Sequence, residues 1–428
     1  MGRICTTIWI APFALLAGCV TIGVPGSASS YPRVSTAVRS TLAAALETHD
    51  REAVTRNTLL LLDMGASLQD STFDRIVPDL DPARIRAHRW YDKRRGEPIA
   101  WLRESFRNNG LTRAVGIYDD SRLFAEVPAE YRLVEGIAYD RQTDRLFIGT
   151  VVDGRLAYHD NGDWHEVALG NPRSGLFGMA IDQQRRMLWI ATGSVEQTAV
   201  EGARMTGLIA VDLDTLRVAR RVPVADGATP GVANDLVIGP DGTVYVSNSV
   251  TGAIQRCVVG CTQLDALLPA GSFSSPQGLS LSDKSDRLYV ADYETGLWLV
   301  SIGSGKREPV LSTEPRMFEG IDGLLGFSKD IMVGIQNGTR PRRIIRLGPE
   351  IGRHRLRFDV YETRGESGGE PTLGTIKPST PTDPGGLLYI ADGQWDRFGA
   401  GGVLVDGAPP RKTPIRINPL EGSIVAGR

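Results

Sequence analysis

Four polar residues, far apart in the chain, could together supply oxygen ligands to one hard cation. They are Glu135, Asn234, Gln277 and Asp322, and each opens a similar stretch of sequence. Carboxylate and amide oxygens suit Ca²⁺, which accepts several oxygen ligands at loosely defined geometry. Asn, Asp and Gln at strand starts also cap turns, so a purely structural role is the alternative. The recurrence of polar oxygen at one position favours a cation site.

The elements that must position these residues are copies of an internal repeat. The copies begin, in chain order, at Glu135, Phe177, Asn234, Gln277, Asp322 and, in a weaker form, Pro371. Subtracting these positions gives spacings of 42 to 57 residues. Each copy combines an alternating strand, a polar turn such as the one at 240–242, and a second strand rich in aliphatic and aromatic residues.

A propeller blade holds four antiparallel strands in about 40–50 residues, which matches the repeat. Six copies therefore predict an all-β fold, a six-bladed β-propeller over residues 111–428. A β-sandwich is the competing fold, but its strands would not recur six times as one pattern. In a propeller the innermost strand of each blade starts at the central channel, where these first residues would meet. Phe177 would give that site an apolar wall, or would simply pack the channel.

Residues 20–110 differ from the repeat region in composition and in the spacing of their apolar residues, and they predict a small helical segment before the propeller. Val38, Leu42 and Leu46 are spaced as on one helical face, and Gly65 is a plausible C-cap for a second helix. A third helix is expected near residues 97–110. The segment could be a solvated spacer or a packed cap on the propeller.

The N-terminus predicts export. Arg3 precedes an uncharged apolar run at 8–17, which is too short to span a bilayer comfortably. Residues 16–19, Leu-Ala-Gly-Cys, resemble a bacterial lipobox, which implies lipidation of Cys19, a signal peptide over residues 1–19 and a lipid-anchored protein of the cell envelope. The alternatives are an ordinary signal peptide cut after Ala28, giving a secreted or periplasmic protein, and a retained signal anchor. Val20 rather than an acidic residue implies the outer membrane, where the cell has one.

Charge and cysteine content narrow the function further. The chain has 48 basic and 50 acidic residues, without a basic run interleaved with aromatics, which argues against nucleic-acid binding. Beyond the leader, Cys257 and Cys261 are the only cysteines. In an oxidising compartment they could form a disulfide, although three intervening residues make the geometry demanding and free thiols are the alternative. The five histidines show no metal or triad spacing, and no Gly-x-Ser-x-Gly motif supports a serine hydrolase.

Residues 130–400 resemble the senescence-marker-protein/gluconolactonase family of six-bladed propellers and, more distantly, the paraoxonases and the royal-jelly/yellow proteins. The resemblance rests on "VEGIAYD", "ANDLVIGPDGTVYVSNS", "PQGLSLSDKSDRLYVADY" and "EGIDGLLG". It implies a divalent metal, commonly calcium, at the channel mouth. Family members hold this metal with a Glu of the first blade, an Asn of the fourth and an Asp of the fifth. An Asn-Asp pair of the third blade lies close to metal and substrate.

Carried onto this sequence, the resemblance makes Glu135, Asn234, Gln277 and Asp322 the expected metal ligands. Glu135 and Asp322 match the family in residue type, and Asn234 with Asp235 matches the third-blade pair. Gln277 departs from the family, because it stands where the fourth-blade Asn is expected. Its amide oxygen can still ligate, but its longer side chain shifts that oxygen by about a bond length and puts metal affinity in question.

The resemblance implies a metal-dependent hydrolase of lactones or related esters. The metal would polarise the substrate carbonyl, and a carboxylate would activate water. Asp322 is the first candidate for that base and Asp235 the second, while Asn234 and Phe177 are expected to contact the small-molecule substrate. The competing hypothesis is a propeller that only binds a ligand or another envelope protein, because one fold can host both functions.

Overall fold

The computed structural model describes residues 35–66, 68–107, 120–225, 231–312, 316–328, 330–339, 342–349, 355–364 and 369–420. Cys19 and the whole predicted leader lie outside the described residues. No helix in the described ranges is both long and apolar enough to cross a membrane.

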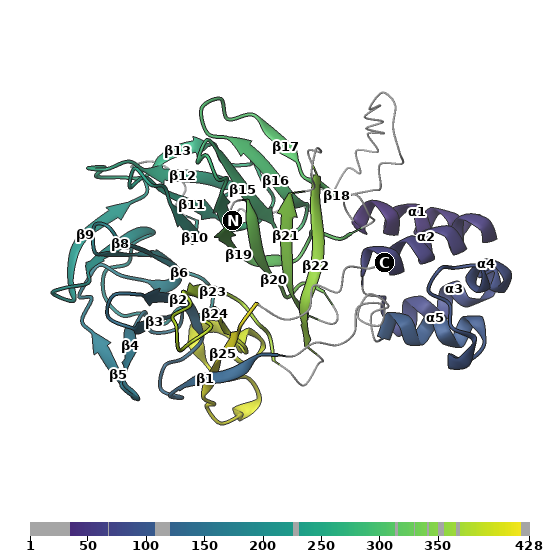
Figure 1. The fold of residues 1–428 in the computed structure, drawn as a ribbon, viewed down its shortest axis with the longest axis horizontal. Coiled ribbons are helices and arrows are strands. Elements are labelled where there is room, and N and C mark those ends of the chain that lie inside the picture. The colour runs from purple at the N-terminus through teal and green to yellow at the C-terminus, as the bar shows by residue number, and fades with distance from the viewer. Residues whose placement is uncertain are drawn as a thin grey trace, which may run out of the picture. The chain divides into compact units, whose positions relative to one another are not determined.

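The strands form the six-bladed β-propeller that the repeat predicted (Figure 1). The strands of the first three blades are β2 (Val134–Asp140), β3 (Arg145–Thr150), β4 (Leu156–Asp160) and β5 (Asp163–Val167); β6 (Gly175–Asp182), β7 (Met187–Gly193), β8 (Gly207–Asp212) and β9 (Arg217–Pro223); and β10 (Ala233–Ile238), β11 (Val244–Asn248), β12 (Ala253–Cys257) and β13 (Asp265–Leu268). Within each blade, sequential strands pair antiparallel from the centre outwards.

The other three blades vary this plan. Their strands are β14 (Pro276–Leu281), β15 (Arg287–Asp292), β16 (Gly296–Ser301) and β17 (Arg307–Pro309); β18 (Leu311–Ser312), β19 (Ile321–Ser328), β20 (Ile331–Gln336), β21 (Arg342–Pro349) and β22 (Arg355–Arg364); and β23 (Gly374–Lys377), β24 (Gly386–Ile390), β25 (Thr413–Asn418) and β1 (Arg122–Val127). In the fifth blade, β18 adds parallel to β22. In the sixth, β1 from the start of the propeller pairs with β25, so the two ends of the propeller share one sheet.

The innermost strands close a ring. Neighbouring contacts run from β2 through β6, β10, β14 and β19 to β23, and β23 contacts β2. Buried aliphatic and aromatic side chains fill the spaces between blades, for example Ile148, Leu388 and Ile415 between the first blade and the sixth. Because alternate residues of a strand face opposite sides, each blade buries one face against each neighbour. This burial explains why the second strand of each repeat copy is rich in apolar residues.

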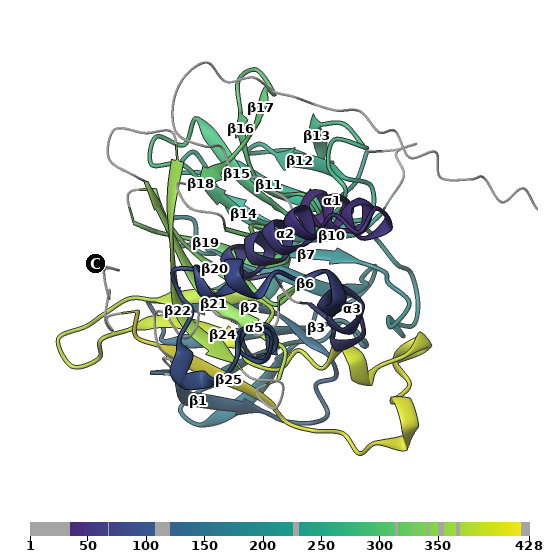
Figure 2. The ribbon, with the colours of Figure 1, turned by 90° about the vertical axis from the view of Figure 1, so that its right-hand side faces the viewer.

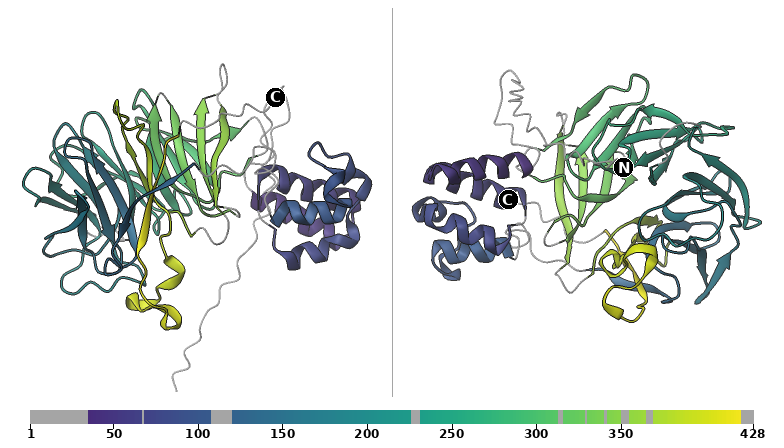
Figure 3. Two further views of the ribbon diagram at one scale, coloured as in Figure 1. Left: turned by 60° about the horizontal axis from the view of Figure 1, so that its bottom comes forward. Right: turned by 180° about the vertical axis from the view of Figure 1, so that it is seen from behind.

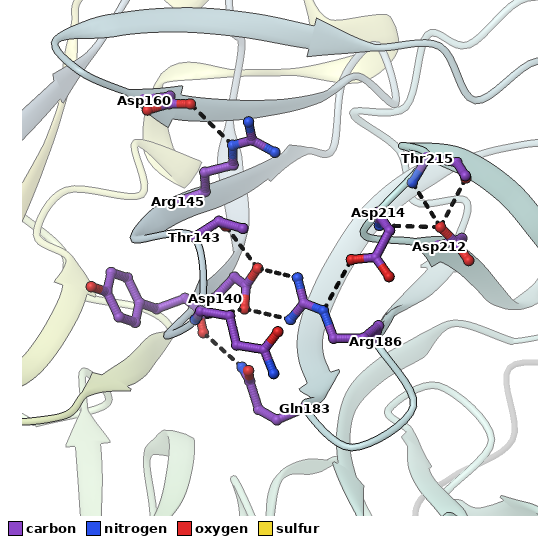
Figure 4. A network of polar contacts seen from close by, with 11 residues as sticks. Asp140, Thr143, Arg145, Asp160, Gln183, Arg186, Asp212, Asp214 and Thr215 are labelled. Carbon is purple, nitrogen blue, oxygen red and sulfur yellow. Dashed lines mark hydrogen bonds and ion pairs between the residues drawn. The ribbon is translucent and has the colours of Figure 1, made fainter.

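Polar contacts between turns also join adjacent blades. Arg186, in the turn after β6, donates two hydrogen bonds to the Asp140 carboxylate at the end of β2, at 2.7 and 2.8 Å, and contacts Asp214 at 3.2 Å (Figure 4). These hydrogen bonds outweigh the effect of burial and hold the pKa of Asp140 below its usual value. Asp212 accepts from the backbone of its own turn, at Thr215 and Asp214. This network joins turns of the first and second blades and lies at the end of β2 away from Glu135.

Short helices precede the propeller: α1 (Ser35–Glu47), α2 (Arg51–Met64), α3 (Asp70–Ile76), α4 (Pro82–Arg86) and α5 (Pro98–Arg107), with 3₁₀ turns η1 (Val77–Asp79) and η2 (Lys93–Arg95). The three helices expected from the sequence correspond to α1, α2 and α5. Helices α1 and α2 contact each other (Figure 2), and Gly65 caps α2 at φ 75°, a left-handed conformation that suits glycine. Helices α3 and α4 were not expected, because five to seven residues are too few to show a period.

The helices contact the propeller at the segment that leads into β19. The Met317 N–H donates to the Met64 carbonyl at 3.1 Å, and Arg316 donates to the Asp63 carbonyl at 3.0 Å. Met317 is 7% exposed and belongs to the same apolar cluster as Leu61 of α2. Of the two roles left open by the sequence, these contacts favour a packed cap.

Candidate functional site

In five blades, the pairing between the first and second strands shifts register at the first residue of the repeat copy. The side chain of that residue therefore departs from the regular alternation of the strand. The shifts lie between Val134 and Gly136 in β2, Leu176 and Met179 in β6, Ala233 and Leu236 in β10, Pro276 and Leu279 in β14, and Ile321 and Gly323 in β19. Such irregularities, typical of β-bulges, re-aim a side chain that the strand would otherwise place in the sheet face. The same local device therefore recurs at equivalent places around the ring.

The residues re-aimed in this way meet at one pocket of about 250 Å³, here called the acidic pocket. Its lining comprises Glu135, Phe177, Val195, Val232, Asn234, Ser249, Gln277, Tyr293, Asp322, Asn337, Glu370 and Trp395. The four predicted metal ligands and Phe177 are thus brought together, although they come from five different blades. Among the described residues of this lining, three are acidic and none is Lys, Arg or His.

Two carboxyl groups of the acidic pocket are held in surroundings that oppose their ionisation. Burial raises the pKa of Glu135 well above its usual value, and the negative charge of Asp322 raises it further. Burial likewise raises the pKa of Asp322 to about 7, partly offset by a hydrogen bond from Asn337. Acids that repel each other and lack a basic partner favour either a proton or a cation between them.

Hydrogen bonds orient both carboxylates. The Asn337 amide donates to Asp322 Oδ2 at 2.7 Å, and the Tyr293 hydroxyl donates to the Asn337 Oδ1 atom at 2.9 Å. On the other side, the Trp395 indole N–H donates to Glu135 Oε2 at 2.9 Å. Each carboxylate therefore has one oxygen fixed by a neighbouring side chain.

The two amides of the predicted metal set contact one another. Asn234 Nδ2 donates a short hydrogen bond to Gln277 Oε1, and Gln277 Nε2 donates to Ser275 Oγ at 2.9 Å. The longer side chain of Gln277 reaches far enough across to the third blade to make this contact. Its amide oxygen is thereby engaged, and a rotation of the Gln277 amide would free it for a ligand.

Sequence reasoning missed four polar lining residues. Ser249, Tyr293 and Asn337 each directly follow the second strand of a blade, so they repeat at a position that was not compared between copies. Glu370 immediately precedes Pro371, the expected first residue of the sixth copy, and it is Glu370 that lines the pocket. Glu370 also forms an ion pair with Arg342 at 3.2 Å. A comparison of the second-strand ends would have found the first three.

Trp395 was missed for a different reason. It lies in the 3₁₀ turn η4 (Trp395–Arg397), inside a long connection between β24 and β25 that has no counterpart in the other copies. No repeat position points to it, and its contact with Glu135 joins residues from opposite ends of the propeller sequence.

Asp235, the second candidate base, does not line the acidic pocket. It lines a separate cavity of about 400 Å³, here called the channel cavity, which is bounded by residues further along the innermost strands, such as Ile137, Met179 and Leu324. The Leu236 N–H donates to Asp235 Oδ1 at 2.8 Å, and burial raises the pKa of Asp235 to about 7. The two candidate bases therefore belong to two different surroundings.

Asp235 occupies the second position of its copy, where four of the other five copies have glycine and the sixth has Thr372. A Cβ at Gly136 would lie 2.4 Å from the Phe177 carbonyl oxygen, and one at Gly278 would lie 2.3 Å from the Leu324 nitrogen. The second position thus faces the backbone of the next blade. In the third blade it holds Asp235, whose carboxylate lies against Gly178.

The donor set of the acidic pocket fits a hard cation better than a soft one. It offers carboxylate and amide oxygens, without sulfur or imidazole among the described lining residues. Throughout the described ranges, no group of three or more His, Cys, Asp or Glu side chains is arranged to hold a metal. Glu135 and Asp322 would supply two charges and the amides the remaining oxygens, a low charge count that suits a weak calcium site.

Outside this site, Cys257 and Cys261 are joined by a disulfide with their Cα atoms 5.4 Å apart. It closes the tight connection after β12, on the third blade. Arg220 donates to the Cys261 carbonyl oxygen, which links this connection to the second blade.

Comparisons with known proteins support the fold. The sequence matches no protein-family model and no curated protein. Among solved structures, the chain is similar to Mala s 1, an allergen of Malassezia sympodialis, at 14% identity and a TM-score of 0.52, over 70% of this chain and 95% of the other. Identity this low extends the similarity to the fold alone.

Two enzymes also appear among the similar structures. A gluconolactonase from Xanthomonas campestris aligns at 14% identity and a TM-score of 0.44, over 69% of this chain and 98% of the other. A PQQ-bound aldose sugar dehydrogenase from Streptomyces coelicolor gives the same identity and TM-score, over 69% and 97%. Because one fold can host different chemistries, these matches do not decide between a lactonase and a dehydrogenase activity.

Proposed function

We propose that this chain is a calcium-dependent hydrolase of lactones or related esters, with its active site in the acidic pocket. The observation that carries the proposal is the convergence of Glu135, Asn234, Gln277 and Asp322 on one small pocket. Their residue types and spacing in the sequence already indicate oxygen ligands, and four separate irregularities of the strands bring them together. Two apposed acids without a basic partner support a cation there.

Different residues of the acidic pocket would serve different steps of ester hydrolysis. Bound calcium would polarise the carbonyl oxygen of the ester. Asp322 would accept a proton from the attacking water and return it to the alkoxide that leaves when the C–O bond breaks. Asn337 holds Asp322 Oδ2 at 2.7 Å, which limits rotation of that base. Phe177 and Val232 form an apolar wall against which the substrate ring would lie.

The experiment combines metal analysis with a substrate panel. A form of the protein that begins after Cys19 is purified, its bound metal is measured, and a panel of lactones is assayed with calcium and with chelator. Asp322→Asn tests the site, and Asp163→Asn, an exposed acid on the outer strand β5, is the matched control. Calcium-dependent turnover that is lost only in Asp322→Asn supports the proposal. Turnover that is unaffected by chelator contradicts it.

A second candidate function is binding without catalysis. The contact between Asn234 and Gln277 favours it, because an amide oxygen needed for the cation is used within the protein. In that case the aromatic and acidic walls would hold a small ligand or a segment of another envelope protein. Calcium binding without turnover of any lactone in the panel would support this alternative.

We also propose that the chain is exported and anchored by lipid on Cys19. The proposal rests on the basic residue, apolar run and Leu-Ala-Gly-Cys at residues 16–19. Mass spectrometry of the mature N-terminus tests it directly: an acylated Cys19 supports the anchor, whereas a free terminus at Ser29 shows ordinary secretion. Cys19→Ser should move the protein out of the membrane fraction.

A further inference from the structure

The connection between β24 and β25 reaches from the sixth blade across to the loops of the first two. Its residues 393–407, here called the 393–407 segment, contain η4, η5 (Ala400–Gly402) and η6 (Val405–Gly407) and project from one end of the ring (Figure 3). Gln394 anchors the near end through a 3.0 Å hydrogen bond to Thr413 Oγ1. At the far end, the Gly401 N–H donates to the Glu196 carbonyl of the second blade at 2.9 Å.

Close packing holds the far end in place. A Cβ on Gly402 would lie 2.2 Å from Val152 Cγ1, so only glycine lets the 393–407 segment approach the first blade this closely. Gly402 also has a φ of 69°, which disfavours other residues. The segment is therefore fixed at both ends, at β25 by Gln394 and at the loops that follow β3 and β7 by Gly401 and Gly402.

Trp395 is the residue that the 393–407 segment delivers to the acidic pocket. Its ring lines the pocket and packs against the apolar cluster that includes Phe177 and Val232. Its indole N–H donates to Glu135 Oε2 at 2.9 Å. Glu135 is 4% exposed, so this donor lies inside the protein, where water competes weakly for the carboxylate.

We propose that Trp395 is a positioning residue of the cation site, acting through Glu135. By holding Oε2, the indole fixes the Glu135 side chain in one orientation in the wall of the acidic pocket. The indole N–H is a donor only and carries no charge, so it orients the carboxylate without competing as a counter-ion. This inference rests on the proposed calcium site and adds to it a residue outside the repeat.

The expected effect follows from side-chain ordering. A glutamate that must be ordered when the cation binds costs about 0.5–1.5 kcal/mol, the value for an immobilised rotamer-rich side chain. Trp395→Phe keeps a ring in the pocket wall and removes the N–H. It should weaken calcium binding by about threefold to tenfold, with the number of sites unchanged.

The test is calcium titration calorimetry on the folded protein, with thermal denaturation in chelator as a second readout. Trp164→Phe is the matched control, because Trp164 also donates its indole N–H to an oxygen, the Glu126 carbonyl at 3.0 Å, far from the acidic pocket. Calcium should bind Trp164→Phe as tightly as it binds the wild type, and should bind Trp395→Phe more weakly. A merely structural role would lower the thermal stability of Trp395→Phe in chelator and leave its calcium affinity unchanged.

Trp395→His provides a second variant, because its imidazole keeps an N–H donor on a smaller ring. Partial recovery of calcium affinity relative to Trp395→Phe supports positioning through the hydrogen bond. Wild-type calcium affinity in Trp395→Phe overturns the role of Trp395 while leaving the calcium site standing. A wild-type protein that binds no calcium overturns the proposed function, and the positioning role with it.

Discussion

Asp322 and Asp235 each have a pKa raised to about 7, yet they line different cavities, and only Asp235 is fully buried. Asp322 shares the acidic pocket with Glu135 and several polar groups, and its orientation is fixed by the Asn337 side chain. Asp235 lies in the channel cavity among mainly aliphatic residues and is held by the Leu236 backbone. A raised pKa alone therefore does not identify a catalytic acid. The neighbours that could hold a substrate or cation distinguish the two.

The largest expected difference between the two acids is in turnover. Asp322→Asn should lower kcat/KM for a lactone substrate by about 10²–10⁴-fold, the contribution of a general base. Asp235→Asn should change it by less than about tenfold, within the range of indirect effects. Steady-state kinetics on both variants, with circular dichroism to confirm folding, measures this. Equal losses in the two variants would mean that Asp235 also acts in the reaction.

The effect of calcium on thermal stability should differ between the Asp322 and Asp235 variants. A ligand that binds only the folded state stabilises it by about 2.7 kcal/mol at a concentration 100 times its Kd. Chelation should therefore lower the Tm of the wild type and of Asp235→Asn, but not that of Asp322→Asn. Differential scanning calorimetry with calcium and with chelator gives the comparison. Loss of the calcium effect in Asp235→Asn would place the cation nearer the channel cavity.

Gly178→Ala should disturb the Asp235 side selectively. The new methyl would lie 2.4 Å from Asp235 Oδ1 and 2.7 Å from the Asn234 carbonyl oxygen, so the third blade must shift. Overpacking of this kind costs about 1–3 kcal/mol of unfolding free energy. Urea denaturation measures the loss, and Gly303→Ala, where a Cβ meets no atom within 4 Å and the backbone φ is not positive, is the matched control. Calcium affinity falling more than stability would show that Asn234 moves as well.

The smallest expected effect is on pH dependence. Burial raises the pKa of Asp322 and of Asp235 to about 7, so between pH 4 and 7 the folded protein binds more protons than the unfolded chain. Stability in chelator should therefore fall as pH rises from 6 to 8, by about 1 kcal/mol for each acid. Because the charge of Asp322 adds to the raised pKa of Asp235, Asp322→Asn should remove its own share and reduce that of Asp235, whereas Asp235→Asn should remove mainly its own. Calcium should cancel the share of Asp322 and reduce that of Asp235, and a wild type with flat stability over this range would contradict both shifts.

Features that recur in each repeat copy could be predicted from the sequence. Contacts between residues of different blades could not. The blade count and the first residues Glu135, Asn234 and Asp322 were predictable, because strand alternation and one recurring oxygen position are local patterns. The engagement of Gln277 with Asn234 was not, since it depends on how far two blades lie apart. Trp395 sits in a connection unique to one blade. The role expected for Asp235 came from the family resemblance, while the space for its carboxylate depends on Gly178 of another strand.

The pairing of β1 with β25 has a consequence for how this protein comes into being. Arg122 of β1 pairs with Ile417 of β25. During synthesis, β1 therefore emerges long before the strand with which it pairs. Chains dominated by such distant pairings fold slowly, and until β25 arrives both ends of the nascent array present unpaired backbone that invites association with other chains. A ribosome stalled before residue 413 would leave an open arc of blades. Chaperones that shield exposed strand edges should therefore matter more for the yield of this protein than for its stability once the ring has closed.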